Sequence, residues 1–177
     1  MANLAGKVEA EVEIKCDADE FFHSWGGKAH QLPNLCPEKL HNVEVHEGDW
    51  KTEGSAKLWT YVHAQICSSF LNFAFVCDRL CGFVSGRCDG KKKVAKEIIE
   101  AIDEEKKLVT FKVIEGDLME LYKTFIATVH VDTQGESNVV TWTFEYEKLN
   151  ENVEDPNTLM GMCINMTKDI EAHHLQQ

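Results

Sequence analysis

Residues 108–147 read LVTFKVIEGDLMELYKTFIATVHVDTQGESNVVTWTFEYE, and this stretch decides the fold. It is the main part of a longer run, residues 92–147, in which apolar and polar side chains alternate. A period of two over successive segments predicts antiparallel strands with one apolar face and one solvated face. The apolar positions of the pattern are Val109, Phe111, Val113, Met119, Leu121, Phe125, Val129, Val140, Trp142, Phe144 and Tyr146.

A long amphipathic helix follows this run and is the candidate to cover its apolar face. Asp155 suits the N-cap of that helix, and Pro156 suits its first helical position. A helix of 18 residues would span roughly 27 Å, enough to cross a domain of this size. A curved sheet closed over one helix can leave a hollow, so the pattern points to binding of an apolar ligand. The residues that fall on one helical face are Leu159, Cys163, Met166 and Ile170.

Smaller elements are predicted before residue 63. Asp17 predicts the N-cap of a short helix, with Glu20 as its capping-box partner three residues later. That helix carries Phe21, Phe22 and Trp25. The other expected elements are strands at 6–15, 40–47 and 54–62 and a second short helix at 28–35.

The composition limits the classes of partner. The chain has 177 residues, a net charge of −12 and a pI near 5.1. The length suits one domain over 1–177, and the acidity argues against nucleic acid or anionic membrane surfaces as partners. The N-terminus has no apolar core of a secretory leader, which predicts a cytoplasmic protein with reduced cysteines. No zinc-ligand spacing, dinucleotide fingerprint or nucleophile motif is present, so no metal, cofactor or catalytic residue is assigned.

Residues 64–88, AQICSSFLNFAFVCDRLCGFVSGRC, do not follow either periodicity. Their apolar run is too short for a bilayer span of about 20 residues. Without them, Val62-His63 would join Asp89-Gly90, and Asp-Gly is a favoured turn between two hairpin strands. We therefore interpret 64–88 as an insertion at the tip of the hairpin after the third strand.

Several stretches resemble the plant major latex proteins, a branch of the Bet v 1 superfamily (pathogenesis-related class 10). They are KVEAEVEIK, KAHQLPNLCP, VEVHEGDWKTEGSAKLW, DGKKKVAKEIIEAIDEEKKLVTFKVIEGDLMELYKTF, VTWTFEYEK and DPNTL…NMTKDIEAHHL. The resemblance covers the chain except about 64–88. It implies an α+β helix-grip fold: a seven-stranded curved antiparallel sheet around a long C-terminal helix, two short helices and a large apolar cavity. It also implies a part in defence and stress responses and the carriage of hydrophobic molecules.

The sequence departs from this superfamily in two places. The glycine-rich loop of the pathogenesis-related branch is reduced here to EGDWKTEGSAK, which weakens any ribonuclease role. The second departure is the insertion at 64–88. Genes of the superfamily commonly carry an intron near this hairpin, so we hypothesise that 64–88 is retained intron sequence, which transcript sequencing can test.

The candidate cavity residues follow from the resemblance, because periodicity alone leaves open whether the apolar face meets a packed core or a hollow. They come from the first short helix, the strands and the long helix. The set is Phe21, Phe22, Trp59, Tyr61, Phe111, Val113, Phe125, Trp142, Phe144, Cys163 and Met166.

The leading functional prediction is a monomeric, non-enzymatic carrier of a hydrophobic small molecule that is sterol-like, phenolic or hormone-like. The alternative is an enzyme of secondary metabolism on the same scaffold, which would need a desolvated acid or base inside the cavity. Lys123 is the candidate, because it interrupts the apolar positions Met119, Leu121 and Phe125. A ribonuclease is the third, weaker possibility.

Overall fold

The computed structural model describes residues 4–62 and 91–176, so the predicted insertion at 64–88 lies outside the described residues. Seven strands form an antiparallel sheet of order β1-β7-β6-β5-β4-β3-β2. This confirms the predicted α+β class and strand count. The strands are β1 Ala5–Ile14, β2 Leu40–Glu47, β3 Ala56–Val62, β4 Lys92–Asp103, β5 Leu108–Gly116, β6 Tyr122–Gln134 and β7 Ser137–Lys148. The helices within the described residues are α1 Ala18–Trp25, η1 Ala29–Gln31, α2 Leu32–Leu35, η3 Asp117–Glu120 and α3 Asn157–His174.

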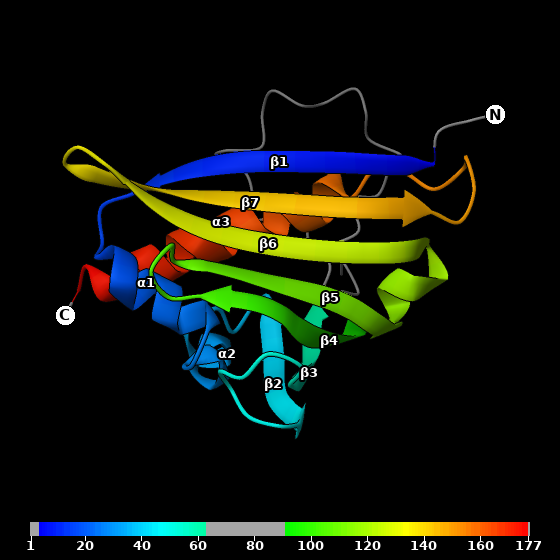
Figure 1. The fold of residues 1–177 in the computed structure, drawn as a ribbon, viewed down its shortest axis with the longest axis horizontal. Coiled ribbons are helices and arrows are strands. Elements are labelled where there is room, and N and C mark those ends of the chain that lie inside the picture. The colour runs from blue at the N-terminus through cyan, green and yellow to red at the C-terminus, as the bar shows by residue number, and fades with distance from the viewer. Residues whose placement is uncertain (1–3, 63–90, 177) are drawn as a thin grey trace, which may run out of the picture.

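The long helix α3 lies across the concave face of the curved sheet, with α1 and α2 near its C-terminal half (Figure 1). The predicted alternation holds along the central strands: Val109, Phe111 and Val113 of β5 are all buried. Trp142 and Phe144 of β7 and Ile170 of α3 are buried together in one continuous apolar core between the sheet and the helix. Sheet and helix therefore bury each other's apolar faces, as the sequence pattern predicts.

A buried pair of hydrogen bonds fixes α3 against the sheet. The indole Nε1 of Trp142 donates to Thr167 Oγ1 over 2.9 Å, and that hydroxyl donates to the Cys163 carbonyl over 2.9 Å. Thr167 has no exposed surface, so both of its hydrogen-bonding functions are satisfied inside the core. The contact sets the rotation of α3 relative to β7.

The predicted N-cap of α3 is wrong. Pro156 takes the N-cap position, where no side chain caps the helix, and its carbonyl accepts a bond from Met160 N over 3.0 Å. The Asp155 carboxylate instead accepts from the Tyr146 hydroxyl and pairs with Lys148 Nζ at 2.8 Å. Two partners on β7 thus compete successfully with the helix terminus for this carboxylate.

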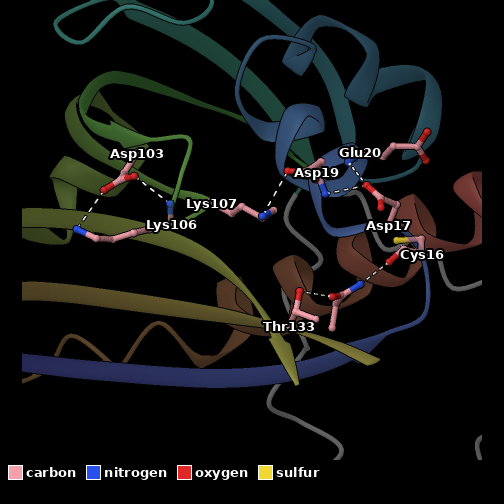
Figure 2. A network of polar contacts seen from close by, with 9 residues as sticks. Cys16, Asp17, Asp19, Glu20, Asp103, Lys106, Lys107 and Thr133 are labelled. Atoms are coloured by element: carbon pink, nitrogen blue, oxygen red, sulfur yellow. Dashed lines mark hydrogen bonds and ion pairs between the residues drawn. The ribbon is translucent and has the colours of Figure 1, made fainter. Parts of the chain in front are cut away.

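The predicted N-cap of α1 is confirmed, but its capping box is not. Asp17 Oδ1 accepts from the backbone N–H of Asp19 at 2.9 Å and of Glu20 at 3.0 Å (Figure 2). The Glu20 carboxylate lies 3.6 Å from His174 Nδ1. Figure 2 also shows Lys107, in the β4–β5 turn, paired with Asp19 at 3.4 Å. The start of α1 is therefore held both by its own cap and by the neighbouring hairpin.

We expect Asp17→Ala to lower the free energy of unfolding by about 1 kcal/mol, because two backbone N–H groups at the start of α1 lose their acceptor. Urea denaturation followed by circular dichroism would measure the loss. Asp17→Asn is the matched control, since its side-chain oxygen can still accept. Equal destabilisation by both variants would contradict a capping role.

The segment before β6 departs from the predicted strand. Met119 lies in the short helix η3, and Leu121 is 40% exposed rather than inward-facing. A register irregularity follows between Tyr122 and Thr124, so the two residues between Tyr122 and Phe125 both lie away from the core. Lys123 is one of them, and its side chain is 64% exposed and pairs with Glu147 at 2.9 Å. The enzyme alternative required an inward-facing Lys123, and this side chain points to solvent instead.

Candidate ligand-binding cavity

An apolar cavity of about 70 Å³ lies between the sheet and α3. Its aromatic wall is built from α1, β3 and β7: the Trp25 ring stacks on Trp59 with centroids 6.1 Å apart and meets Trp142 edge-on at 4.7 Å. The lining residues are Trp25, Leu40, Trp59, Tyr61, Ala95, Glu97, Phe111, Leu118, Phe125, Ala127, Trp142, Phe144, Leu159, Met162, Cys163 and Met166.

Most of the candidate residues lie in this lining. The structure brings together Trp59, Tyr61, Phe111, Phe125, Trp142, Phe144, Cys163 and Met166 around the cavity. Phe21 and Phe22 of α1 and Val113 of β5 are buried in the core but do not line it. The α1 residue that reaches the cavity is Trp25, one helical turn after the two phenylalanines.

Sequence reasoning missed a pair of charged residues at the cavity, buried Lys57 on β3 and half-buried Glu97 on β4. They are direct cross-strand partners in the register of the two strands. Lys57 has no exposed surface; its ammonium lies 5.4 Å from the Phe111 ring centroid and 5.6 Å from that of Trp50. It donates to the Gly26 carbonyl over 3.4 Å. Glu97 lines the cavity, and no group in the described residues donates a hydrogen bond to its carboxylate.

A signal for this pair was present in the sequence. Lys57 has the same parity as Trp59 and Tyr61 on β3, so a period of two already places it on the buried face. Glu97 stands in the same way between Ala95 and Ile99, which are both buried. Applying the alternation to charged residues as strictly as to apolar ones finds both.

The environment of the pair shifts the pKa of each member. Burial raises the pKa of the Glu97 carboxyl from 4.5 to about 7, against the opposing attraction of Lys57. Burial lowers the pKa of the Lys57 ammonium from 10.5 to about 8, against the attraction of Glu97 and then Asp49. Near neutral pH the Glu97 carboxyl in the cavity wall is thus partly protonated and partly ionised.

The cavity is smaller than the resemblance implies. Pockets for drug-sized ligands measure about 300–1,000 Å³, so a ligand of that size requires the lining to move. The lining supplied by α3 includes Met162 and Met166, whose unbranched side chains adapt to irregular shapes. A second hollow of about 440 Å³ lies next to the cavity, and Tyr61, Leu118 and Leu159 line both. Displacing these three side chains would join the two spaces.

Comparison with known proteins is consistent with this geometry. The chain matches the family described as the pathogenesis-related protein Bet v 1 family over residues 3–72 and 83–177. It is 41% identical to MLP-like protein 43 of Arabidopsis thaliana, and the match covers 99% of the chain and 97% of that relative. It is 40% identical to MLP-like protein 28 of the same plant over 99% of the chain, but it spans only 46% of that relative's length.

The solved structure of ginseng major latex-like protein 151 from Panax ginseng superposes with a TM-score of 0.81 at 41% identity. That match covers 97% of this chain and 99% of the ginseng protein. The fold and the sequence together define a helix-grip protein. The chain belongs to the pathogenesis-related protein Bet v 1 family, and its relatives there are the major latex-like proteins.

Within 4–62 and 91–176, no helix is long and apolar enough to cross a bilayer. The same residues contain no group of three or more His, Cys, Asp or Glu side chains placed to hold a metal ion.

Proposed function

We propose that this chain binds a hydrophobic small molecule in the cavity between the sheet and α3 and carries it as part of a plant defence or stress response. The observation that carries the proposal is the hollow itself: a closed core would be filled by the side chains that here surround about 70 Å³. Membership of the Bet v 1 family, which is known for hydrophobic ligands, supports it.

The adaptability of the lining supports a carrier with an expandable site. Methionine and leucine side chains on α3 face rigid aromatic rings on the sheet, so the helix side of the cavity can rearrange while the sheet side keeps its shape. The proposal contains no chemical step. Lys123, the base that the enzyme alternative required, is exposed and paired with Glu147 on the solvent-facing side of β6 and β7.

Filling the cavity should weaken ligand binding. Ala127 of β6 lines the cavity and lies beside Phe111 and Phe144 in the strand register. Ala127→Leu places three more carbon atoms in the hollow, so we expect the affinity for the neutral dye N-phenyl-1-naphthylamine to fall at least about tenfold. Fluorescence titration measures the affinity.

The matched control for Ala127→Leu is Thr124→Leu, an exposed position on the same strand. It should bind the dye as the wild type does. A saturable dye signal that survives Ala127→Leu in a folded protein would place the dye outside the cavity and overturn the proposal. Circular dichroism establishes folding, because extra volume in a core can itself cost about 1–3 kcal/mol.

A further inference from the structure

Three cavity-lining side chains hold polar atoms without a partner. The indole Nε1 atoms of Trp25 and Trp59 and the hydroxyl of Tyr61 are buried and make no hydrogen bond within the described protein. The three residues are only 5%, 6% and 4% exposed, respectively. Native proteins satisfy the great majority of buried polar groups, and leaving one unpaired costs about 1–3 kcal/mol. Three unpaired groups around one hollow indicate a ligand that supplies the missing partners.

The fourth polar group of the cavity lining, the Glu97 carboxylate, lacks a hydrogen-bond donor among the described residues. Indole N–H groups can only donate, whereas the Glu97 carboxylate can only accept once it is ionised, which requires a pH above its pKa of about 7. Glu97 follows Ala95 on the inner face of β4, and Ala95 is the register partner of Trp59. Its charge also acts on Tyr61 from the adjacent strand. The four residues all line the cavity, and Trp25 stacks on Trp59, so we call Trp25, Trp59, Tyr61 and Glu97 the polar subsite.

We propose that the polar subsite selects an apolar ligand carrying a neutral hydroxyl group and excludes ligands carrying a carboxylate. A hydroxyl oxygen accepts from an indole N–H while its hydrogen is donated to the Glu97 carboxylate, so one group meets both needs. A hydrocarbon meets neither. A carboxylate offers only acceptors and brings a second negative charge against Glu97 in a site of low dielectric. The Lys57 ammonium does not line the cavity and is held by the Gly26 carbonyl and two aromatic rings.

This inference rests on the proposed carrier function and adds the chemistry of its ligand. The test is isothermal titration of the full-length chain at pH 8, where Glu97 is mostly ionised, with naphthalene, 2-naphthol and 2-naphthoate, which share one ring system. We expect 2-naphthol to bind about tenfold more tightly than either of the others, because a buried hydrogen bond to a charged group is worth about 1.5–3 kcal/mol.

Variants that remove the polar atoms and keep an aromatic ring or a side chain of equal length assign the preference to the polar subsite. Trp59→Phe combined with Tyr61→Phe removes two unpaired groups and should reduce the naphthol-to-naphthalene affinity ratio to below about threefold. Glu97→Gln should reduce the naphthol-to-naphthoate ratio similarly. Glu100→Gln, at an exposed position on the same strand, should keep both wild-type ratios.

The outcomes separate this inference from the carrier function. Binding of all three probes with equal affinity would overturn the polar subsite and leave the carrier function standing. A preference for 2-naphthol that persists in the Phe variants and in Glu97→Gln would also overturn it. Binding of none of the probes would overturn both, and Ala127→Leu identifies signals that arise outside the cavity.

Discussion

Replacing Gly116 by alanine is expected to lower the free energy of unfolding by about 3–5 kcal/mol. Gly116 ends β5 with φ 111° and ψ −170°, a region of backbone conformation that is open essentially to glycine alone. A Cβ at this position would lie 2.1 Å from the Val94 carbonyl oxygen and 2.9 Å from its carbonyl carbon. Both obstacles are backbone atoms, so no side-chain rotation relieves the overlap.

The β4 backbone that faces Gly116 cannot move away without breaking other contacts. Val94 N donates to Asp117 Oδ2 over 2.6 Å, and Ala95, the register partner of Gly116, lines the cavity. Moving β4 away would open this bridge and displace the cavity wall together. We therefore expect Gly116→Ala to weaken dye binding as well as stability.

Gly135 in the β6–β7 turn provides the matched control. It also has a positive φ, 67°, but an added Cβ would meet nothing within 4 Å. Gly135→Ala should cost only about 1 kcal/mol, the ordinary penalty for the left-handed conformation. Chemical denaturation of both variants measures the difference. Similar losses of unfolding free energy at the two positions would show that the clash of the added Cβ with β4 does not destabilise the protein.

The sheet was predictable from the sequence because a buried face imposes strict alternation on each strand. The same rule gave the wrong side-chain directions near Lys123. There an irregularity between β6 and β7 adds one residue to β6, so the residues before it point to the opposite side of the sheet from the one that strict alternation predicts. A bulge leaves no mark in the alternation itself, so the sequence pattern could not reveal it. The prediction that Asp155 caps α3 was wrong for a related reason. Its partners Tyr146 and Lys148 lie on a strand, and capping rules consider only residues close to the helix terminus in sequence.

The cavity was less predictable than the sheet. Periodicity places Phe111 and Val113 on one face, but only the packing of α3 decides that Phe111 meets the hollow and Val113 does not. The unpaired atoms of Trp25, Trp59 and Tyr61 likewise depend on which neighbours surround each ring. Such features belong to the tertiary arrangement. Glu97, in contrast, could have been found from the alternation of β4.

The second large effect concerns Glu97 and the dependence of stability on pH. Its pKa is about 7 in the folded protein, compared with 4.5 in the unfolded chain. Below pH 4.5 both states hold the proton; between pH 4.5 and 7 the unfolded chain loses it first. The folded state then binds more protons, so its stability falls as pH rises through this window. At 1.36 kcal/mol for each pKa unit, the loss attributable to Glu97 is at most about 3 kcal/mol.

Other groups titrate in the same range, so the prediction is stated as a difference between variants. Burial lowers the pKa of His174 below its ordinary 6.5, which makes stability rise as pH increases toward 6.5 and opposes the Glu97 effect. The charged or titratable groups that act on Glu97 are Lys57 and Tyr61 from β3 and Cys163 from α3. Burial raises the pKa of both Tyr61 and Cys163, and that of Lys57 is about 8, so none of the three changes charge between pH 5 and 7.

Glu97→Gln should therefore become more stable than the wild type as pH rises from 5 to 7, with the gap growing by about 1–3 kcal/mol and levelling off above pH 7. Urea denaturation at half-unit pH intervals measures the gap. Glu100→Gln removes an exposed carboxylate from the same strand and should stay parallel to the wild type. Above pH 8 the wild type should regain stability as buried Lys57 loses its proton, because its pKa is about 8 when folded and 10.5 when unfolded. Parallel curves for Glu97→Gln and the wild type from pH 5 to 7 would mean that the Glu97 carboxyl is solvated in the folded protein. The polar subsite would then lose its acceptor, since a solvated carboxylate already has water as its donor.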